Sequence, residues 1–394
     1  MTPDEQSVLD RIDEELLVRV TCQLLQATGQ NPPGEEAATV AVLAAAGREL
    51  GLDVVTSPVE PGRDNVSITL AGGNGPGLLI LGHTDVVPVG DGWTTDPYGG
   101  VVQDGRIYGR GASDMKGGLA AALVALAALR GAGLSGPVEL AAVVDEEETG
   151  KGIRAYVDKA RGVGGSGFLG CVTAEPTDLQ TIIAARGDSY LRVAVHGRAC
   201  HAGNPDDGAN AIYGAAAVVA EIERLHTELA ADPHPLLGPA TWSVGQINGG
   251  TGGSIVPADC VIVADRRLLP GESPAAALDG LRSRVAALRL EDRGLSVELE
   301  MPMEMPAFET AADAELVRVI EAARVEAGGP DLPLAGWTAA CDGGYVARDL
   351  GVPVVVLGPG SVTTQAHRGD ESVPIAELVT AARAYTLTAL RLLG

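Results

Sequence analysis

Short, largely apolar segments recur along the chain, and each is followed at once by glycine or polar residues. The clearest are residues 78–81 before Gly82-His83, residues 138–144 before Asp145, and residues 352–357 before Gly358-Pro359. Such segments are typical of strands buried on both faces of a parallel sheet. Between the first two lies Gly117–Arg130, an alanine- and leucine-rich stretch with Gly131 just past its end, which predicts a buried crossover helix. Together they predict a β-α-β unit, with functional groups expected beyond the carboxyl ends of its strands.

The pattern changes at residue 188. The segment SYLRVAVHG alternates between apolar and polar residues, an alanine-rich helix is predicted over residues 209–229, and WSVGQING and CVIVADRRL predict further strands. A helical pattern resumes after residue 301, in PAFETAADAELVRVIEAA. At 394 residues the chain exceeds the roughly 250 to 300 residues over which one hydrophobic core grows. We therefore expect an α/β domain formed by residues 1–187 and 302–394, interrupted by an inserted α+β domain over residues 188–301.

Composition supports an α/β fold and narrows the range of partners. Hydrophobic residues make up 46% of the chain but aromatic residues only 3%, so Ala, Val and Leu must fill the interior. The formal net charge is −24, and the chain contains only three lysines. Because such a charge repels nucleic acids and anionic membrane surfaces, neither is expected as a partner.

The cysteines and the N-terminal segment indicate the cellular compartment. The five cysteines are widely spaced and form no Cys-x-x-Cys pair, which argues against a disulfide framework and a zinc ribbon and favours a reducing cytoplasm. The first residues, MTPDEQSVLDRIDEELL, are acidic and amphipathic, and no apolar run reaches the roughly 18 residues of a membrane span. We therefore expect a cytoplasmic protein with no membrane segment.

The first candidate for chemistry is His83-Thr84-Asp85, directly after a predicted strand. In an extended chain, residues i and i+2 point the same way, so Asp85 is expected to hydrogen-bond and orient His83 while His83 holds a metal. An ordinary polar loop is the commoner explanation of such a tripeptide in so acidic a chain. The motif alone is therefore weak evidence for a metal site.

The second candidate is the glycine-rich segment 109–118, which presents Asp114 just before the predicted buried helix. Glycines at this place allow a tight turn and close approach of the backbone. Asp114 as the N-terminal cap of that helix is the alternative explanation. The segment lacks the Gly-Lys-Ser/Thr ending of a phosphate loop, which argues against nucleotide binding.

The remaining candidates are acids and a histidine near other strand ends. The run 145–148, Asp-Glu-Glu-Glu, follows an apolar strand. Its four carboxylates repel one another unless bound cations or solvent reduce the repulsion. Glu175 in TAEPT and His367 in QAHRGDE are unspecific by themselves. Together with His83 and Asp114, these residues supply oxygen and nitrogen ligands but no thiolate, which suits a co-catalytic pair of Zn, Co or Mn ions.

The chain resembles the acetylornithine deacetylase, succinyl-diaminopimelate desuccinylase, glutamate carboxypeptidase and aminoacylase group of metallopeptidases, family M20. The resemblance covers nearly the whole chain and rests on spaced motifs: GHTDVVPVGDGW, DPYGGVVQDGRIYGRGASDMKGG, DEEETGKG, AEPT, ARG at residues 185–187, HGRACHAGNPDDGANAI, DRRLLPGE and GPGSVTTQAHRGDE. It implies a di-zinc peptidase-like fold, in which helices flank a mostly parallel sheet and the inserted α+β domain serves as lid and dimerisation domain.

The resemblance also implies a set of ligands for two divalent metal ions, with zinc favoured and cobalt or manganese as alternatives. Asp114 is expected to bridge the two ions. One site is completed by His83 and Glu175, the other by Glu147 and His367. One bridging carboxylate and two further ligands for each ion make up a co-catalytic centre.

By the same resemblance, Glu146 is expected to be the general base that takes a proton from the attacking water. The run of acids leaves a second register open, in which Glu147 is the base and Glu148 the ligand. The first register is preferred because residues 145–152 then align with the acidic and glycine-rich pattern of the family.

Two residues of the inserted domain resemble substrate-binding residues of the family. His201 resembles a histidine that reaches the active site of a neighbouring subunit and stabilises the oxyanion, which implies a homodimer. A solvated histidine in a turn is the alternative. Arg267 resembles the arginine that binds the substrate carboxylate, for which a guanidinium is geometrically suited.

The expected activity is hydrolysis of the amide bond of an N-acyl amino acid, as in the acetylornithine and diaminopimelate branch of the family. A dipeptidase or glutamate-type carboxypeptidase of the same family is the alternative, because the preference for one leaving group depends on pocket shape. An inactive homologue that binds a ligand would be expected to have lost part of the ligand set, whereas here every expected ligand is present.

Overall fold

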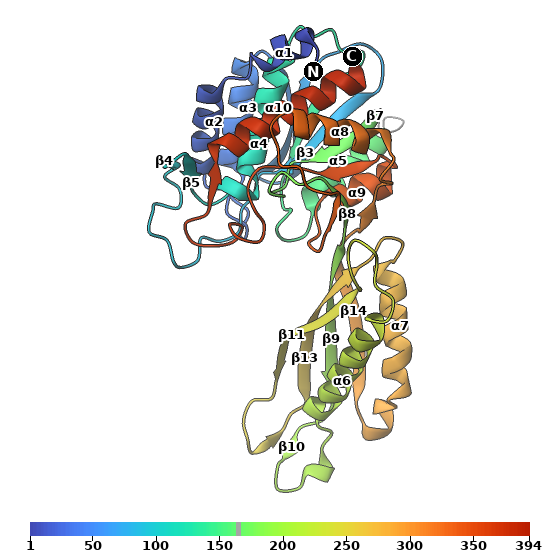
Figure 1. The fold of residues 1–394 in the computed structure, drawn as a ribbon. Coiled ribbons are helices and arrows are strands. Elements are labelled where there is room, and N and C mark those ends of the chain that lie inside the picture. Colours follow the sequence, from blue (N-terminus) through green and yellow to red (C-terminus); the bar gives the residue numbers. More distant parts are fainter. Residues whose placement is uncertain (163–166) are drawn as a thin grey trace. The chain divides into compact units, whose positions relative to one another are not determined.

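The computed structural model describes residues 1–162 and 167–394, and within them the chain forms two compact units (Figure 1). Unit 1 comprises residues 1–183, 309–336 and 342–394, and unit 2 comprises residues 184–308 and 337–341. The sequence pattern places the boundaries at residues 188 and 301. Unit 2 extends further because its first and last long strands along the chain, β9 (Gly187–His196) and β14 (Ser296–Met305), run beyond the alternating segments.

Unit 1 is built on a sheet with a parallel centre. Its strands are β1 (Asp53–Glu60), β2 (Arg63–Leu70), β3 (Gly77–His83), β6 (Val138–Val143), β7 (Phe168–Thr173), β8 (Ile182–Ala185), β15 (Phe308–Glu309), β16 (Ala335–Trp337) and β17 (Val354–Val356). Over the described residues these nine strands have the order β1-β2-β6-β3-β7-β17-β8-β15, with β16 paired to β8. Strands β6, β3, β7 and β17 are parallel, whereas β1, β2 and β8 pair antiparallel. The sheet is therefore mixed, with the predicted buried strands at its centre.

Helices flank this sheet: α1 (Pro3–Leu9), α2 (Glu14–Gln26), α3 (Ala37–Glu49), α4 (Gly117–Ala128), α5 (Lys151–Gly162), α8 (Glu315–Glu326), α9 (Gly343–Tyr345) and α10 (Ile375–Leu393). Helix α4 connects β3 to the parallel strand β6, which confirms the predicted β-α-β unit. It is buried along most of its length because α2 and α10 pack against it as well as the sheet. A Cβ at Gly118 would collide with the carbonyl of Ala174, so glycine allows this helix to approach the end of β7.

A small second sheet in unit 1 carries part of the site. It has the order β18-β5-β4, formed by β4 (Val101–Gln103), β5 (Arg106–Tyr108) and β18 (Ser372–Pro374). Strand β18 pairs antiparallel with β5. This pairing joins two segments far apart in the sequence, the glycine-rich segment that follows β5 and the segment that precedes β18.

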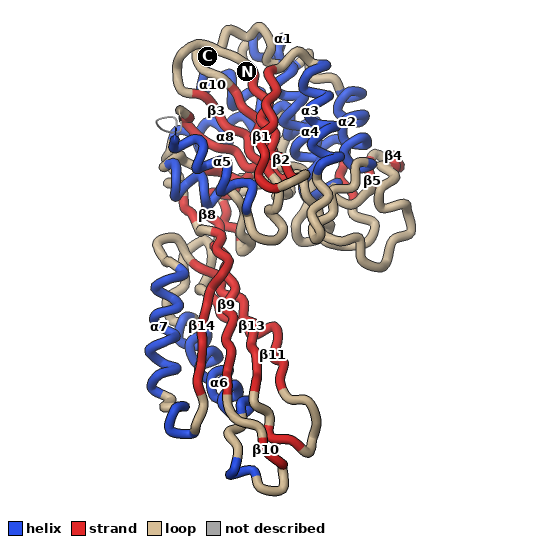
Figure 2. The backbone as a smooth tube through the Cα atoms, turned by 180° about the vertical axis from the view of Figure 1, so that it is seen from behind, coloured by secondary structure: helices blue, strands red, loops and turns tan. Residues whose placement is uncertain are grey.

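Unit 2 is an antiparallel sheet with two helices on one face (Figure 2). Its strands have the order β11-β13-β9-β14, in which β11 (Thr241–Gly249) pairs with β13 (Asp259–Leu268) and β13 pairs with β9. Helices α6 (Ala211–Leu229) and α7 (Pro274–Ala287) pack on the apolar residues that alternate along these strands, such as Val193 and Ile262. A short pair, β10 (Cys200–His201) and β12 (Ile255–Val256), completes the unit. The inserted segment thus has the predicted α+β character.

Two features bear on the sequence-based expectations about location. Among the described residues, no helix combines the length and apolar character needed to span a membrane. All five cysteines lie among the described residues and none of them forms a disulfide; Cys171, Cys260 and Cys341 are buried.

Candidate metal centre

The parallel strands of unit 1 bring the candidate ligands to one edge of the sheet. Strand β3 ends at His83, β6 ends just before the acidic run 145–148, β7 ends two residues before Glu175, and β17 precedes the loop that carries His367. Because the carboxyl ends of parallel strands meet at the same edge, residues far apart in the sequence lie together here. Asp114 joins them from the segment between β5 and α4.

Asp114 lies between the two histidines. Its Oδ1 is 3.2 Å from Nε2 of His83, and its Oδ2 is 3.3 Å from Nε2 of His367. His83 Nε2 is also 3.6 Å from Oε1 of Glu175, and His367 Nε2 is 3.2 Å from Oε2 of Glu147. One carboxylate therefore has one oxygen in each of two ligand groups, which is the arrangement required of a bridging ligand.

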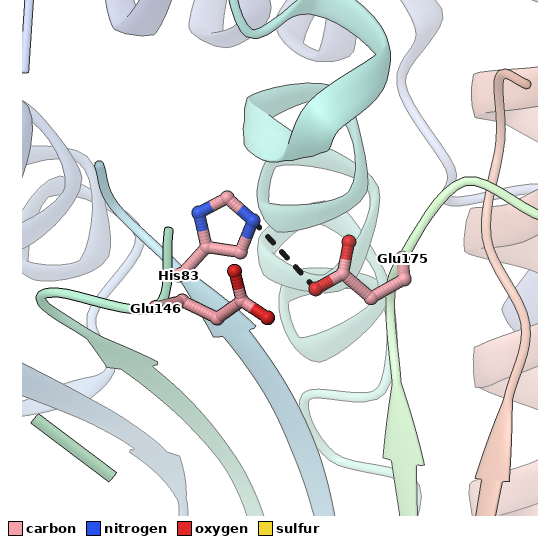
Figure 3. A group of neighbouring side chains, drawn as sticks. All are labelled: His83, Glu146 and Glu175. Atoms are coloured by element: carbon pink, nitrogen blue, oxygen red, sulfur yellow. Dashed lines mark ion pairs between the residues drawn. The ribbon is translucent and has the colours of Figure 1, made fainter. Parts of the chain in front are cut away.

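Glu146 lies beside the first of these groups. Figure 3 shows its carboxylate directed toward the imidazole of His83 and the carboxylate of Glu175. Ligand atoms of these three residues lie within 4.8 Å of one another, as do those of His83, Asp114 and Glu147. Glu148, the next acid along the run, is exposed. The turn after β6 thus directs Glu146 and Glu147 inward and Glu148 outward.

The buried carboxylates of the cluster favour bound cations. Burial raises the pKa of Glu146 and of Glu175 well above the usual range. Hydrogen bonds to Asp114 and Glu147 raise the pKa of His367 to about 10. Oε1 of Glu147 is buried and has no hydrogen-bond partner among the described residues. A set of hard oxygen and imidazole donors with an unpaired buried oxygen fits divalent metal ions.

Asp85 acts differently from the sequence-based expectation. Nδ1 of His83 is 2.9 Å from the backbone carbonyl oxygen of Asp85 but 3.6 Å from its carboxylate. The carboxylate instead accepts hydrogen bonds from the backbone amides of Glu146 at 3.2 Å and Glu147 at 3.1 Å. Because β3 ends at His83, the extended geometry that would align Asp85 with His83 does not continue. Asp85 thus orients His83 through its carbonyl and the acidic turn through its side chain.

A buried polar network supports the same turn from the N-terminal part of the chain. Asn31 donates to the carboxylates of Asp85 at 2.9 Å and Asp145 at 3.1 Å. Arg63 donates to Asp145 at 2.9 Å and also pairs with the fully buried Glu36. Asn31 and Arg63 could not be predicted from the sequence, because neither lies near a candidate ligand in the chain.

Glu371 holds the segment that carries Asp114. Its Oε1 accepts hydrogen bonds from the backbone amides of Gly111, Ser113 and Asp114 at 3.1, 2.9 and 3.0 Å, and its Oε2 is 2.5 Å from Nη1 of Arg110. The backbone of Asp114 is not helical, and α4 begins only at Gly117, so helix capping does not account for Asp114. Glu371 is the second acid of the motif QAHRGDE and follows the candidate ligand His367 by four residues. This position was the only sequence feature that could have indicated its role.

The other two predicted residues lie in unit 2. His201 is exposed on β10, and its Nδ1 accepts a hydrogen bond from the amide of Gly203 at 3.0 Å. Arg267 on β13 contacts two carboxylates, those of Asp188 at 3.3 Å and Asp265 at 3.0 Å. The predicted residues thus divide into a cluster in unit 1 and two residues in unit 2.

Comparison with known proteins places this centre in a family. The family model described as "Peptidase family M20/M25/M40" matches residues 79–391. The chain belongs to this family. The match spans the cluster in unit 1 and the whole of unit 2, so the activity is hydrolysis of amide or peptide bonds, as the sequence analysis predicts.

Relatives of known sequence or structure cover nearly the same length. Acetylornithine deacetylase of Klebsiella pneumoniae (strain 342) is 33% identical over 337 residues, which is 82% of each chain. The M20 family metallo-carboxypeptidase Sso-CP2 of Sulfolobus solfataricus has a TM-score of 0.77 and 19% identity over 99% of both chains. The YXEP protein of Bacillus subtilis, described as a dinuclear metal-binding peptidase of family M20, has a TM-score of 0.73 and 16% identity over 97% of this chain and 99% of its own. These structures share the fold of both units.

Proposed function

We propose that this chain is a metal-dependent deacylase that hydrolyses the amide bond of N-acyl amino acids, of the acetylornithine deacetylase type. The observation that carries the proposal is Asp114, with one carboxylate oxygen near His83 and the other near His367. This is a donor set for two divalent cations, and a curated relative at 33% identity is an acetylornithine deacetylase.

The contacts of Asp114 with the two histidines separate the candidate ligands into two groups, one for each ion. We assign His83 and Glu175 to one ion and Glu147 and His367 to the other, with Asp114 shared. The set contains no thiolate, which favours zinc and is compatible with cobalt or manganese. Two bound ions would acidify a water molecule and polarise the scissile carbonyl.

Glu146 is the proposed general base. It takes a proton from the attacking water and passes it to the departing amine. Its position beside His83 and Glu175, together with the inward direction of its side chain, supports this role (Figure 3). The exposure of Glu148 argues against the shifted register, because an exposed carboxylate outside the cluster is a poor candidate for a ligand.

Unit 2 would supply the substrate contacts. We assign to Arg267 the binding of the substrate carboxylate, and to His201 the stabilisation of the oxyanion in the active site of a second subunit, which requires a homodimer. The exposure of His201 on the short β10-β12 pair is compatible with such an exchange. The five cysteines, none of them in a disulfide, favour a reducing compartment, and we place the enzyme in the cytoplasm.

A dipeptidase or carboxypeptidase is the second candidate. Its support is the shared fold with a metallo-carboxypeptidase of the same family. It differs from the first in the group on the acyl side of the scissile bond, which the metal ligands do not discriminate.

The deciding experiment compares substrates and variants of the metal-loaded protein. Chelated protein is given Zn, Co or Mn and assayed on N-acetylornithine, N-succinyl-diaminopimelate, neutral N-acetyl amino acids, dipeptides and folate-like glutamates. We expect cleavage of N-acyl amino acids to depend on added metal and to fall by about 10²–10⁴-fold in Glu146→Gln. Glu148→Gln is the matched control and should keep both activity and bound metal. Cleavage of dipeptides alone supports the second candidate, and inactivity across the panel refutes both.

A further inference from the structure

His367 is the least enclosed of the five assigned metal ligands. Its side chain is 52% exposed, whereas the side chains of the other four ligands are at most 10% exposed. His367 lies on a loop formed by residues 365–372 (the His367 loop) and has a φ of 62°, a conformation uncommon in residues other than glycine. Because packing does not fix a half-exposed ligand, other contacts must hold the loop that carries it.

Asp370 joins the His367 loop to residues 91–95 (the Trp93 loop), which belong to the connection between β3 and β4 (Figure 1). Its Oδ1 accepts hydrogen bonds from the backbone amides of Thr94 at 2.8 Å and Thr95 at 3.1 Å, and from the hydroxyl of Thr95 at 3.1 Å. Its Oδ2 accepts one from the hydroxyl of Thr94 at 2.6 Å. One carboxylate thus connects segments at least 275 residues apart in the sequence.

The two loops also pack backbone against backbone. A Cβ at Gly369 would lie 2.4 Å from the carbonyl oxygen of Gly92, so this contact requires glycine. The Trp93 loop is itself held in place. Nε1 of Trp93 donates to the carbonyl of Val89 at 2.9 Å, and the guanidinium of the buried Arg110 lies 5.3 Å from the centre of the Trp93 ring. The Trp93 loop is therefore a firm support for the His367 loop.

The carboxylate of Asp370 is ionised at any pH at which a histidine can bind a metal ion. The hydrogen bond from the hydroxyl of Thr94, together with those from the amides of Thr94 and Thr95, lowers the pKa of Asp370 to about 2. Hydrogen bonds to an ionised acceptor are stronger than bonds between neutral groups. Because Asp370 lies partly exposed at the surface, its removal should free the loop without unfolding unit 1.

We propose that Asp370 is a positioning residue of the metal centre: by fixing the His367 loop on the Trp93 loop, it holds the imidazole of His367 beside Glu147 for one of the two ions. The inference rests on the proposed function, which assigns His367 and Glu147 to the same ion. The other ion has buried ligands near strand ends, which do not depend on this loop. Loss of Asp370 should therefore weaken one ion and spare the other.

The test measures zinc affinity and needs no substrate. Chelated protein competes with a chromogenic chelator for Zn²⁺, which gives a Kd for each of the two ions. We expect Asp370→Ala to weaken one ion by about 10- to 100-fold and to leave the other within about threefold, as is typical for loss of a residue that orients a ligand. Adding Asp370→Ala to His367→Ala identifies the affected ion: the single ion that remains there should change by less than about threefold.

Two further variants separate the position of His367 from the charge of Asp370. Asp370→Asn keeps an acceptor oxygen for the bonds at Oδ1 but loses the negative charge, so both affinities should stay within about threefold of wild type. Gly369→Ala disturbs the contact with Gly92 and leaves Asp370 unchanged, and it should weaken the same ion as Asp370→Ala. Asp91→Asn, an exposed position on the Trp93 loop, is the matched control and should alter neither affinity.

Three results overturn the inference. Unchanged affinities in Asp370→Ala show that the contact does not position His367, equal weakening of both ions shows a general structural effect, and an Asn variant as weak as the Ala variant shows that charge alone acts. If circular dichroism shows that Asp370→Ala is misfolded, Gly369→Ala takes its place.

Failure of the proposed function gives a different result. If His367→Ala binds both ions as tightly as wild type does, the assignment of ligands is wrong and the inference falls with it. If His367→Ala loses one ion while Asp370→Ala and Gly369→Ala bind both normally, the assignment stands and this inference alone is refuted.

Discussion

Replacing Glu371 by glutamine should destabilise unit 1 far more than a surface exchange of the same kind. Glu371 is fully buried and makes two kinds of contact. One oxygen accepts the backbone amides of Gly111, Ser113 and Asp114, and the other pairs with the guanidinium of Arg110. The glutamine retains one acceptor oxygen but loses the negative charge.

The size of the expected loss in stability follows from the burial of Arg110. Its side chain is only 2% exposed, and in the variant its guanidinium is buried opposite a neutral amide. Removing one partner of a buried ion pair costs about 3–5 kcal/mol, because the other charge remains uncompensated. The backbone carbonyl of Val89 at 2.9 Å and the ring of Trp93 at 5.3 Å still contact Arg110, so the lower end, about 3 kcal/mol, is expected. Arg110→Met combined with Glu371→Gln removes both charges and should cost less than the sum of the single changes by about 2 kcal/mol or more.

Urea denaturation of chelated protein measures this effect. The measurement is made at pH 8, so that Glu371 is ionised and pairs with Arg110 as a charge. Unit 1 is followed through the fluorescence of Trp93 in a background with Trp242→Phe and Trp337→Phe, because both of those tryptophans lie in unit 2. Glu49→Gln on the exposed surface is the control. A loss below about 1 kcal/mol in Glu371→Gln, or additive losses in the double variant, would show that the pair does not hold the Asp114 segment in the manner described.

Three further predictions test the centre and the fold. His367→Ala should bind about one divalent ion where wild type binds two, as counted by metal analysis after dialysis; unchanged stoichiometry contradicts the assigned ligand groups. Metal removal should lower the free energy of unfolding by about 2.7 kcal/mol for each ion present at 100 times its Kd, and a chelator that leaves Tm unchanged refutes this coupling. A hydrogen bond from Arg391 lowers the pKa of Glu326 to about 2, so Arg391→Ala should cost about 1 kcal/mol above pH 4.5. That cost should disappear as the pH falls toward 2; a difference that persists in acid refutes the assignment.

The sequence predicts the scaffold of unit 1 well because its strands are apolar throughout. A strand buried on both faces leaves a continuous apolar run, and α4 leaves a long run of alanine and leucine, so β3, α4 and β6 could be located within a few residues. The ends of β9 and β14 were less predictable. Both strands continue past the segments that alternate, and strand ends carry little pattern of their own.

The ligands could be predicted from the sequence, but their supports could not. A ligand must be one of a few residue types near a strand end, which restricts the search. Asn31 and Glu371, by contrast, act through contacts that span 54 and 257 residues of sequence, to Asp85 and to the amide of Asp114. Asp85 does contact His83 as expected, with its carboxylate 3.6 Å from Nδ1, but the hydrogen bond goes to its backbone carbonyl at 2.9 Å, because the strand ends at His83.

Asp85 and Glu371 support this centre through the same kind of contact. Each is a fully buried carboxylate that accepts successive backbone amides of a segment bearing candidate ligands: Asp85 from Glu146 and Glu147, Glu371 from the segment that ends at Asp114. Such a contact fixes the backbone more firmly than a side-chain contact, because the ligand is left few rotatable bonds. The Asp85 carboxylate also adds negative charge behind the ligands, which strengthens the attraction for divalent cations at short range. The charge of Glu371 is instead paired with Arg110, so Glu371 acts by holding the Asp114 segment in place.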